Sequence, residues 1–76
     1  MRELLEFLVE KITGSKDFSI EENQEEDRSD FIIKVDPSVF GLVIGKGGNT
    51  IRAIRNALKV RAIIEKKGIN VSVVEK

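Results

Sequence analysis

The chain has 76 residues, with 13 Lys and Arg against 13 Asp and Glu, and it contains no Cys, His or Tyr. A protein of this size buries only about 60% of the surface that its unfolded form exposes, so we expect one domain with a modest core. The lack of Cys excludes disulfides and thiolate metal sites, and without His and Tyr most nucleophilic and acid–base mechanisms are excluded too. The composition therefore predicts a protein that is not an enzyme and that uses neither a metal ion nor a cofactor.

The net charge of zero conceals two oppositely charged halves. Residues 1–36 carry 5 basic and 11 acidic side chains, whereas residues 37–70 carry 7 basic side chains and one acid, Glu65. Such asymmetry is typical of proteins that bind nucleic acids, although two merely solvated surfaces would give the same pattern. The N-terminal segment is too acidic for a signal peptide and no run reaches transmembrane length, so we expect a cytoplasmic protein.

The N-terminal half predicts a helix followed by a β-hairpin. Residues 2–13 place Leu4, Leu5, Leu8 and Ile12 on one helical face, and Gly14 ends the pattern. Alternation over 18–21 predicts a short strand, and the acidic residues 23–29 predict the hairpin loop. Residues 31–35 predict a second strand, which should be central and covered on both faces because its apolar run is nearly continuous.

A short helix should follow the second strand. Asp36 is a suitable N-cap, and Pro37 suits the first helical position, where no backbone N–H is needed. Apolar residues continue to about Ile44, and Gly45 ends the helix.

A longer helix begins at Asn49 or Thr50 and continues to about Lys67, with Gly68 as its stop. Residues 69–74 predict a final strand. Two helices between two parallel strands form a right-handed crossover, while the first two strands form an antiparallel hairpin. The sequence thus predicts an α+β fold of order α-β-β-α-α-β, with a three-stranded mixed sheet and three helices on one face.

The segment Gly45–Gly48, called the glycine loop below, carries the strongest functional signal. Its three glycines leave backbone N–H groups uncovered, and the next helix directs its N-terminal N–H groups to the same place. Lys46 adds a positive charge, so the loop suits a sugar-phosphate backbone. Neither common nucleotide-binding motif fits, because Gly47 stands where a P-loop needs a hydroxyl and Thr50 stands where a dinucleotide fingerprint needs glycine.

Residues 43–51 read V-I-G-K-G-G-N-T-I and match the pattern V-I-G-x-x-G-x-x-I at every fixed position. This pattern resembles the core signature of the KH family of RNA-binding domains; an ordinary glycine-rich turn is the alternative. The order of elements is similar to the type II KH fold, and the whole chain looks like the small stand-alone bacterial KH proteins. We therefore expect a single KH domain over residues 1–76.

The resemblance implies a non-catalytic RNA-binding protein. In the KH family, the loop and its flanking helices form one wall of a groove for about four single-stranded nucleotides, and the last strand forms the other wall. Carried over, the RNA-binding residues would be Gly45, Lys46, Gly47, Gly48, Ile44, Ile51, Arg52 and Arg55. The isoleucines could equally serve the core, and the arginines could be part of a solvated surface.

Further residues extend the expected groove. Ile69, Val71 or Val73 would supply the opposite wall, although core packing is the more common role of such residues. Lys59 and Lys66 continue the basic stripe of Arg52 and Arg55 along the long helix. Lys66 and its neighbour Lys67 also lie beside the expected groove and are weaker candidates for RNA contact.

Two features differ from many nucleic-acid-binding domains. The loop has Lys46 and Gly47 between its outer glycines, one charge fewer than many KH loops, which predicts weaker phosphate contact. All four aromatic residues are expected to be buried, so no stacking platform of the RRM or OB type is available. These residues are Phe7, Phe18, Phe31 and Phe40.

The long helix also suggests a protein partner. Over 51–60 its apolar residues span an arc of roughly 180°, wider than the ~100° that a core-facing helix needs, and Ile63 falls on the basic side. Excess apolar surface is typical of interfaces. The resemblance implies a homodimer or pairing with a larger KH-containing protein, although a helix wedged between the sheet and a neighbouring helix would explain the arc equally well.

Two functions remain after this reading. We expect binding of single-stranded RNA with low sequence specificity, compatible with roles at the ribosome, in RNA processing or as an RNA chaperone. The alternative is a KH-like protein-interaction module without its own RNA binding; the acidic half favours it and the intact glycine loop disfavours it. The acidic residues of 21–27 could bind a divalent cation, but such a cluster is more often a solvated loop.

Overall fold

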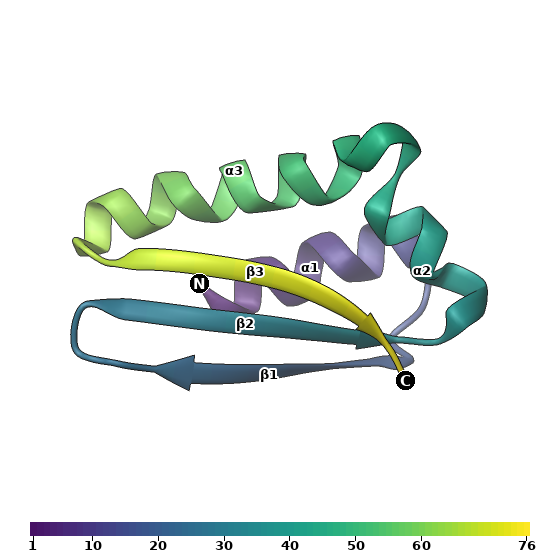
Figure 1. Ribbon diagram of the computed structural model, residues 1–76, viewed down its shortest axis with the longest axis horizontal. Helices are drawn as coiled ribbons and strands as arrows, with labels where there is room; N and C mark the ends of the chain where they lie inside the picture. Colours follow the sequence, from purple (N-terminus) through teal and green to yellow (C-terminus); the bar gives the residue numbers. More distant parts are fainter.

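A computed structural model describes residues 1–76. Its elements are α1 (Arg2–Thr13), β1 (Phe18–Gln24), β2 (Arg28–Val35), α2 (Pro37–Ile44), the 3-10 turn η1 (Lys46–Gly48), α3 (Asn49–Glu65) and β3 (Gly68–Glu75). The central strand β2 pairs antiparallel with β1 and parallel with β3 (Figure 1). The predicted α+β fold, its α-β-β-α-α-β order and its parallel crossover are confirmed.

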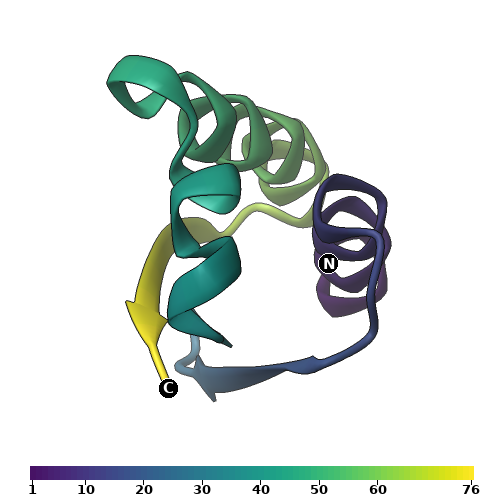
Figure 2. The same ribbon diagram turned by 90° about the vertical axis from the view of Figure 1, so that its right-hand side faces the viewer.

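The core lies between the sheet and the helices, which all cover one face of it (Figure 2). Alternate side chains of β2 point into this core, while Asp30, Ile32 and Lys34 on the other face are half-buried. The buried apolar residues are Leu5, Val9, Ile20, Phe31, Ile33, Val35, Val43, Ile54, Leu58, Ala62 and Val71. No helix is both long enough and apolar enough to cross a membrane.

The two predicted helix boundaries with the clearest chemistry are confirmed. Gly14 adopts a left-handed conformation with φ of 70°, and its N–H donates to the carbonyl of Glu10 after the last turn of α1. The Asp36 carboxylate accepts a hydrogen bond of 2.9 Å from the backbone N–H of Ser38 at the start of α2. This hydrogen bond favours the charged carboxylate and lowers the pKa of Asp36 below its ordinary value.

The hairpin loop is shorter than the sequence suggested. The ladder between β1 and β2 continues to the pairs Asn23 with Asp30 and Gln24 with Ser29, so that only residues 25–27 connect the strands. Polar side chains hid this extension, because a strand ladder is built from backbone groups that every residue but proline supplies. The prediction that β2 is covered on both faces is also wrong, since all three helices lie on one side.

Two further predictions are wrong. The long helix stops at Glu65, and Lys66 rather than Gly68 is its left-handed cap, with φ of 58°. The N–H of Lys67 donates to Ala62 at 2.9 Å and closes this end, so that Gly68 begins β3. Phe7 is 54% exposed, because it lies on the outer face of α1, where the ammonium of Lys11 stands 5.5 Å from its ring centroid.

Candidate nucleic-acid interface

The glycine loop forms the sharp turn between α2 and α3. The N–H of Gly45 donates to Gly41 at 2.8 Å, and the N–H of Gly48 donates to Gly45 at 3.1 Å. Gly45, Gly47 and Gly48 have φ of 75°, 63° and 78°, in the region that favours glycine. Nothing lies within 4 Å of the position that a Cβ would take on Gly47 or Gly48, so this side of the loop is open to a ligand.

Positive charge and backbone donors meet at the loop. Lys46 is exposed, and no side chain caps the N-terminus of α3. The N-terminal N–H groups of a helix carry a partial positive charge and bind anions. Arg52 follows within the first turn, with its Nη1 3.5 Å from Oδ1 of Asn49. The loop and the first turn of α3 therefore form one cationic surface.

The aliphatic residues around the loop have different roles. Val43 is fully buried in the core, and Ile51 is half-buried and packs against the core. Ile44 is half-buried at the end of α2 and does not join the core cluster. Leu42, which the sequence analysis did not single out, is 55% exposed near the loop. The uniformly apolar run of α2 gave no signal for which of its side chains would stay accessible.

One flank of α3 carries the predicted arginines and faces β3. Arg52, Arg55 and Lys59 are exposed and share this flank by their spacing of three and four residues. Nη2 of Arg55 donates a hydrogen bond of 3.2 Å to the backbone carbonyl of Val71 in β3. Val71 itself is buried, which excludes its side chain from an RNA-contacting wall, whereas Ile69 and Val73 are half-buried. The fold thus places α3, which carries both arginines, after the glycine loop and alongside β3 (Figure 1).

A cleft of about 300 Å³ opens further along the seam between α3 and β3. We call it the end cleft, and it is lined by Arg55, Lys59, Ala62, Ile63, Lys67, Gly68 and Ile69. Three of these side chains are cationic and none is acidic. The sequence placed Lys59 and Lys67 near the groove, but the cleft itself depends on the left-handed turn at Lys66, which the sequence did not predict.

Ion pairs divide the cations of this protein into two groups. Arg2, Lys16, Arg28, Lys34 and Lys76 each pair with a carboxylate, and Lys11 lies over an aromatic ring. The remaining seven cations all lie between residues 37 and 70, and none of them forms an ion pair. They are Lys46, Arg52, Arg55, Lys59, Arg61, Lys66 and Lys67.

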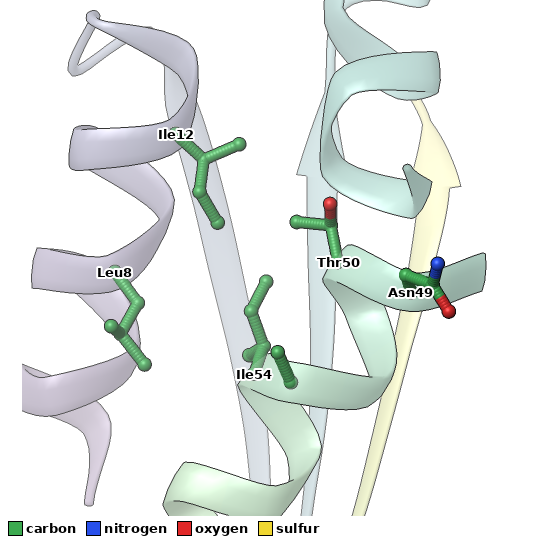
Figure 3. A pocket seen from close by; sticks show the side chains of 6 residues that line it. Leu8, Ile12, Asn49, Thr50 and Ile54 are labelled. Carbon is green, nitrogen blue, oxygen red and sulfur yellow. The ribbon is translucent and has the colours of Figure 1, made fainter. Parts of the chain in front are cut away.

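The outer face of α3 presents apolar surface away from this cationic flank. Val60 is 63% exposed and Ile64 is 73% exposed, and with Ala53 and Ala57 they form a line at spacings of four, three and four residues. We call this line the apolar stripe. Beside it lies a cleft of about 360 Å³ between α1 and α3, lined by Leu8, Ile12, Asn49, Thr50, Ala53 and Ile54. Figure 3 shows Leu8 and Ile12 directed from α1 toward Ile54 and Thr50, while Asn49 points away.

Comparisons with known proteins agree with the geometry. The model of the KhpA/KhpB KH domain matches residues 2–74. The chain is 33% identical over 75 residues to the RNA-binding protein KhpA of Clostridium perfringens, an alignment that covers 97% of this chain and 100% of that protein. No solved structure matches the chain. The resemblance identified from residues 43–51 is therefore confirmed at the level of the family.

Proposed function

Because the chain belongs to the KhpA/KhpB family of KH domains, we propose that it is a non-catalytic protein that binds single-stranded RNA. The bound segment of about four nucleotides lies along α3, with its sugar-phosphate backbone on the glycine loop and its bases toward β3. The relative from Clostridium perfringens carries the name of an RNA-binding protein, which supports RNA as the ligand.

The division of the ion pairs is the observation that carries this proposal. Seven cations between residues 37 and 70 have no carboxylate partner, although the chain holds as many acids as bases. A polyanion gains affinity from each cation that replaces a condensed counterion, and cations already paired in the protein contribute little to this gain. Apart from Arg61, which its spacing places on the other side of α3 from Arg52, the unpaired set begins at the glycine loop and follows α3, which is the path expected for a bound strand.

The loop would hold the backbone without reading the bases. The N–H groups of Gly45 and Gly48 are bonded within the chain, so those of Lys46 and Gly47 and the N-terminus of α3 offer the donors to phosphate oxygens. Lys46 also supplies one point charge. Phosphate contacts of this kind position a nucleic acid but carry no sequence information. Arg55 has further donors besides Nη2, which is engaged by Val71. Besides these remaining donors of Arg55, few side chains are available to read base edges, and we expect low sequence specificity.

Amide chemical shifts test the position of the site. A short RNA of degenerate sequence would be titrated into isotope-labelled protein. The amide resonances of Lys46, Gly47, Gly48 and Arg52 should then shift more than those of α1. Shifts confined to residues outside the glycine loop and the β3 side of α3 would contradict the proposed site. No shifts at all would favour a protein-interaction module instead.

A second copy of the chain is the proposed occupant of the apolar stripe. The spacing of four, three and four residues is that of a helix seam in which side chains of two helices interlock. Ala53 and Ala57 allow close approach of a second helix, and Val60 and Ile64 supply area that is exposed in the single chain. The stripe continues into the apolar cleft beside Leu8 and Ile12, so that a partner helix could cover both. A larger KH-containing protein is the alternative partner.

A further inference from the structure

The end cleft lies beyond the reach of the glycine loop. Lys59 stands about three turns after Gly48 on α3, which corresponds to about 16 Å along the helix axis. The cleft is still part of the same path, because Arg55 lines it and also contacts β3 through Val71. A strand that leaves the loop along the β3 flank of α3 therefore passes Arg55 and arrives at this cleft.

The lining of the end cleft suits a nucleotide. Lys59 and Lys67 bring two ammonium groups without acidic neighbours in the lining, and Ala62 and Ile69 form an apolar floor between α3 and β3. Ile63 is 70% exposed at this cleft, although it lies among basic residues. An inorganic anion would use only the ammonium groups. The combination with exposed apolar surface fits a phosphate joined to a nucleobase, which offers an apolar face.

Negative charge begins where the cleft ends. The hairpin residues 25–27, called the acidic tip, are Glu25, Glu26 and Asp27, and the backbone carbonyl of Asp27 accepts a hydrogen bond of 2.8 Å from the N–H of Gly68. Gly68 lines the cleft and pairs with Arg28 in the sheet. None of the three carboxylates forms an ion pair within 4 Å, although Glu25 and Asp27 lie close enough to Arg28 to help Asp30 raise its pKa. These three acids against one nearby arginine would repel a phosphate within about 8 Å in physiological salt.

We propose that the end cleft binds the last nucleotide of the RNA segment and that the acidic tip stops the strand there. Lys59 and Lys67 hold the phosphate of this nucleotide, and its base lies on Ile63 and Ile69. The chain thereby limits the length of RNA that contributes to affinity. This inference rests on the proposed RNA-binding function, and it adds a second anchoring point at the opposite end of the groove from Lys46.

Affinity as a function of RNA length tests the inference. Degenerate RNAs of about two to ten nucleotides, the shortest of which cannot span from the glycine loop to the end cleft, would be titrated by fluorescence anisotropy. Wild-type affinity should rise until the cleft is filled and then level off. The variant Lys59→Gln with Lys67→Gln should match the wild type on the shortest RNA and lose about tenfold on the RNA that fills the cleft. Lys11→Gln with Lys16→Gln removes the same charge outside the unpaired set and should keep the wild-type length dependence.

The acidic tip has its own variant. Glu25→Gln with Glu26→Gln and Asp27→Asn should let affinity continue to rise beyond the wild-type limit, whereas the same number of neutralised acids on α1, Glu3→Gln with Glu6→Gln and Glu10→Gln, should not. A longer RNA offers more positions at which any variant can bind, and this gain is the same for the wild type and the variants. The ratio of variant affinity to wild-type affinity at each RNA length therefore isolates the effect of the substitutions.

The outcomes separate this inference from the proposed function. Wild-type length dependence in the cleft variant, or an unchanged limit in the tip variant, would overturn the inference while RNA binding stands. A wild-type protein that binds no RNA of any length would overturn both.

Discussion

A Cβ atom added to Gly45 would lie 2.2 Å from Oγ1 of Thr50 and 2.7 Å from its backbone nitrogen. The first residue of the glycine loop thus packs directly against the first turn of α3. No side chain would fit between Gly45 and Thr50, so the chain can approach itself this closely only with glycine at the start of the loop. Gly45 has a structural role in addition to any contact with RNA, while Gly47 and Gly48 face open space.

Substitution of Gly45 by alanine should therefore destabilise the fold. We expect Gly45→Ala to lower the free energy of unfolding by about 2 kcal/mol or more, because its backbone, with φ of 75° and ψ of 169°, lies in a region essentially restricted to glycine that costs other residues about 1–3 kcal/mol. Gly41→Ala is the matched control. Gly41 lies inside α2 with nothing within 4 Å of its Cβ position, so alanine should stabilise the helix by up to about 1 kcal/mol. Urea unfolding followed by circular dichroism measures both, and effects of the same sign would contradict the account.

The end of α3 offers a second matched pair. Lys66 is the one non-glycine residue with positive φ, so Lys66→Gly should raise the free energy of unfolding by about 1 kcal/mol. Lys67→Gly removes the same charge where no positive φ is required, and it should destabilise through the greater freedom of glycine in the unfolded chain. Urea midpoints of the two variants should move in opposite directions. A stabilising Lys67→Gly or a destabilising Lys66→Gly would contradict the positive φ at Lys66.

Asp36 should make the stability depend on pH. Its pKa is lowered in the fold by the hydrogen bond from the Ser38 N–H, so the charged carboxylate stabilises the protein above the unfolded pKa of about 3.9. This stabilisation is lost as pH falls through the folded pKa. Asp36→Asn keeps an N-cap that does not titrate. The two proteins should have similar urea midpoints near neutral pH, and the wild type should fall below the variant in acid; a difference that is independent of pH would contradict this.

The apolar stripe predicts a dimer that one charge can break. The wild-type chain should sediment at twice the mass of 8.5 kDa at micromolar concentration. Ile64→Lys should give the mass of one chain without loss of fold, because Ile64 is 73% exposed in the single chain. Val74→Lys is the control, since Val74 is also exposed but lies on β3, away from the stripe. A wild type that sediments as one chain would contradict the proposed interface.

Much of the fold could be predicted from the sequence because the ends of several helices, and the strands, are determined by the residues that form them. Gly14 and Asp36 act through their own backbone or side-chain geometry, and β-branched runs mark β2 and β3. The end of α3 could not be read in this way, because Lys66 adopts a conformation that its residue type disfavours and that the helix-to-strand turn imposes. The length of the hairpin was missed for a similar reason: the ladder through Asn23 and Gln24 is made by backbone groups that polarity does not report.

The candidate site was predictable in composition but not in layout. The glycine pattern and the spacing of Arg52 and Arg55 identified the loop and the flank of α3. Exposure could not be assigned within the apolar runs: core packing was the favoured role for Ile69, Val71 and Val73, but the sequence could not single out Val71 as the one that is fully buried, and the accessible Leu42 was not foreseen. The partition of charges into paired and unpaired sets also needs the tertiary structure, because partners such as Lys76 and Asp17 are 59 residues apart in the chain.

Anisotropy titrations of a degenerate single-stranded RNA across a salt series test the central claim most directly. The wild type would be compared with a variant that carries Lys46→Asp and Gly47→Asp, whose fold is checked by circular dichroism. Asp tolerates the left-handed backbone of Gly47 better than most residues. We predict that log K of the wild type falls with log salt at about −0.7 per neutralised phosphate, and that the folded variant loses binding. Equal binding by both proteins would contradict an RNA clamp at the glycine loop.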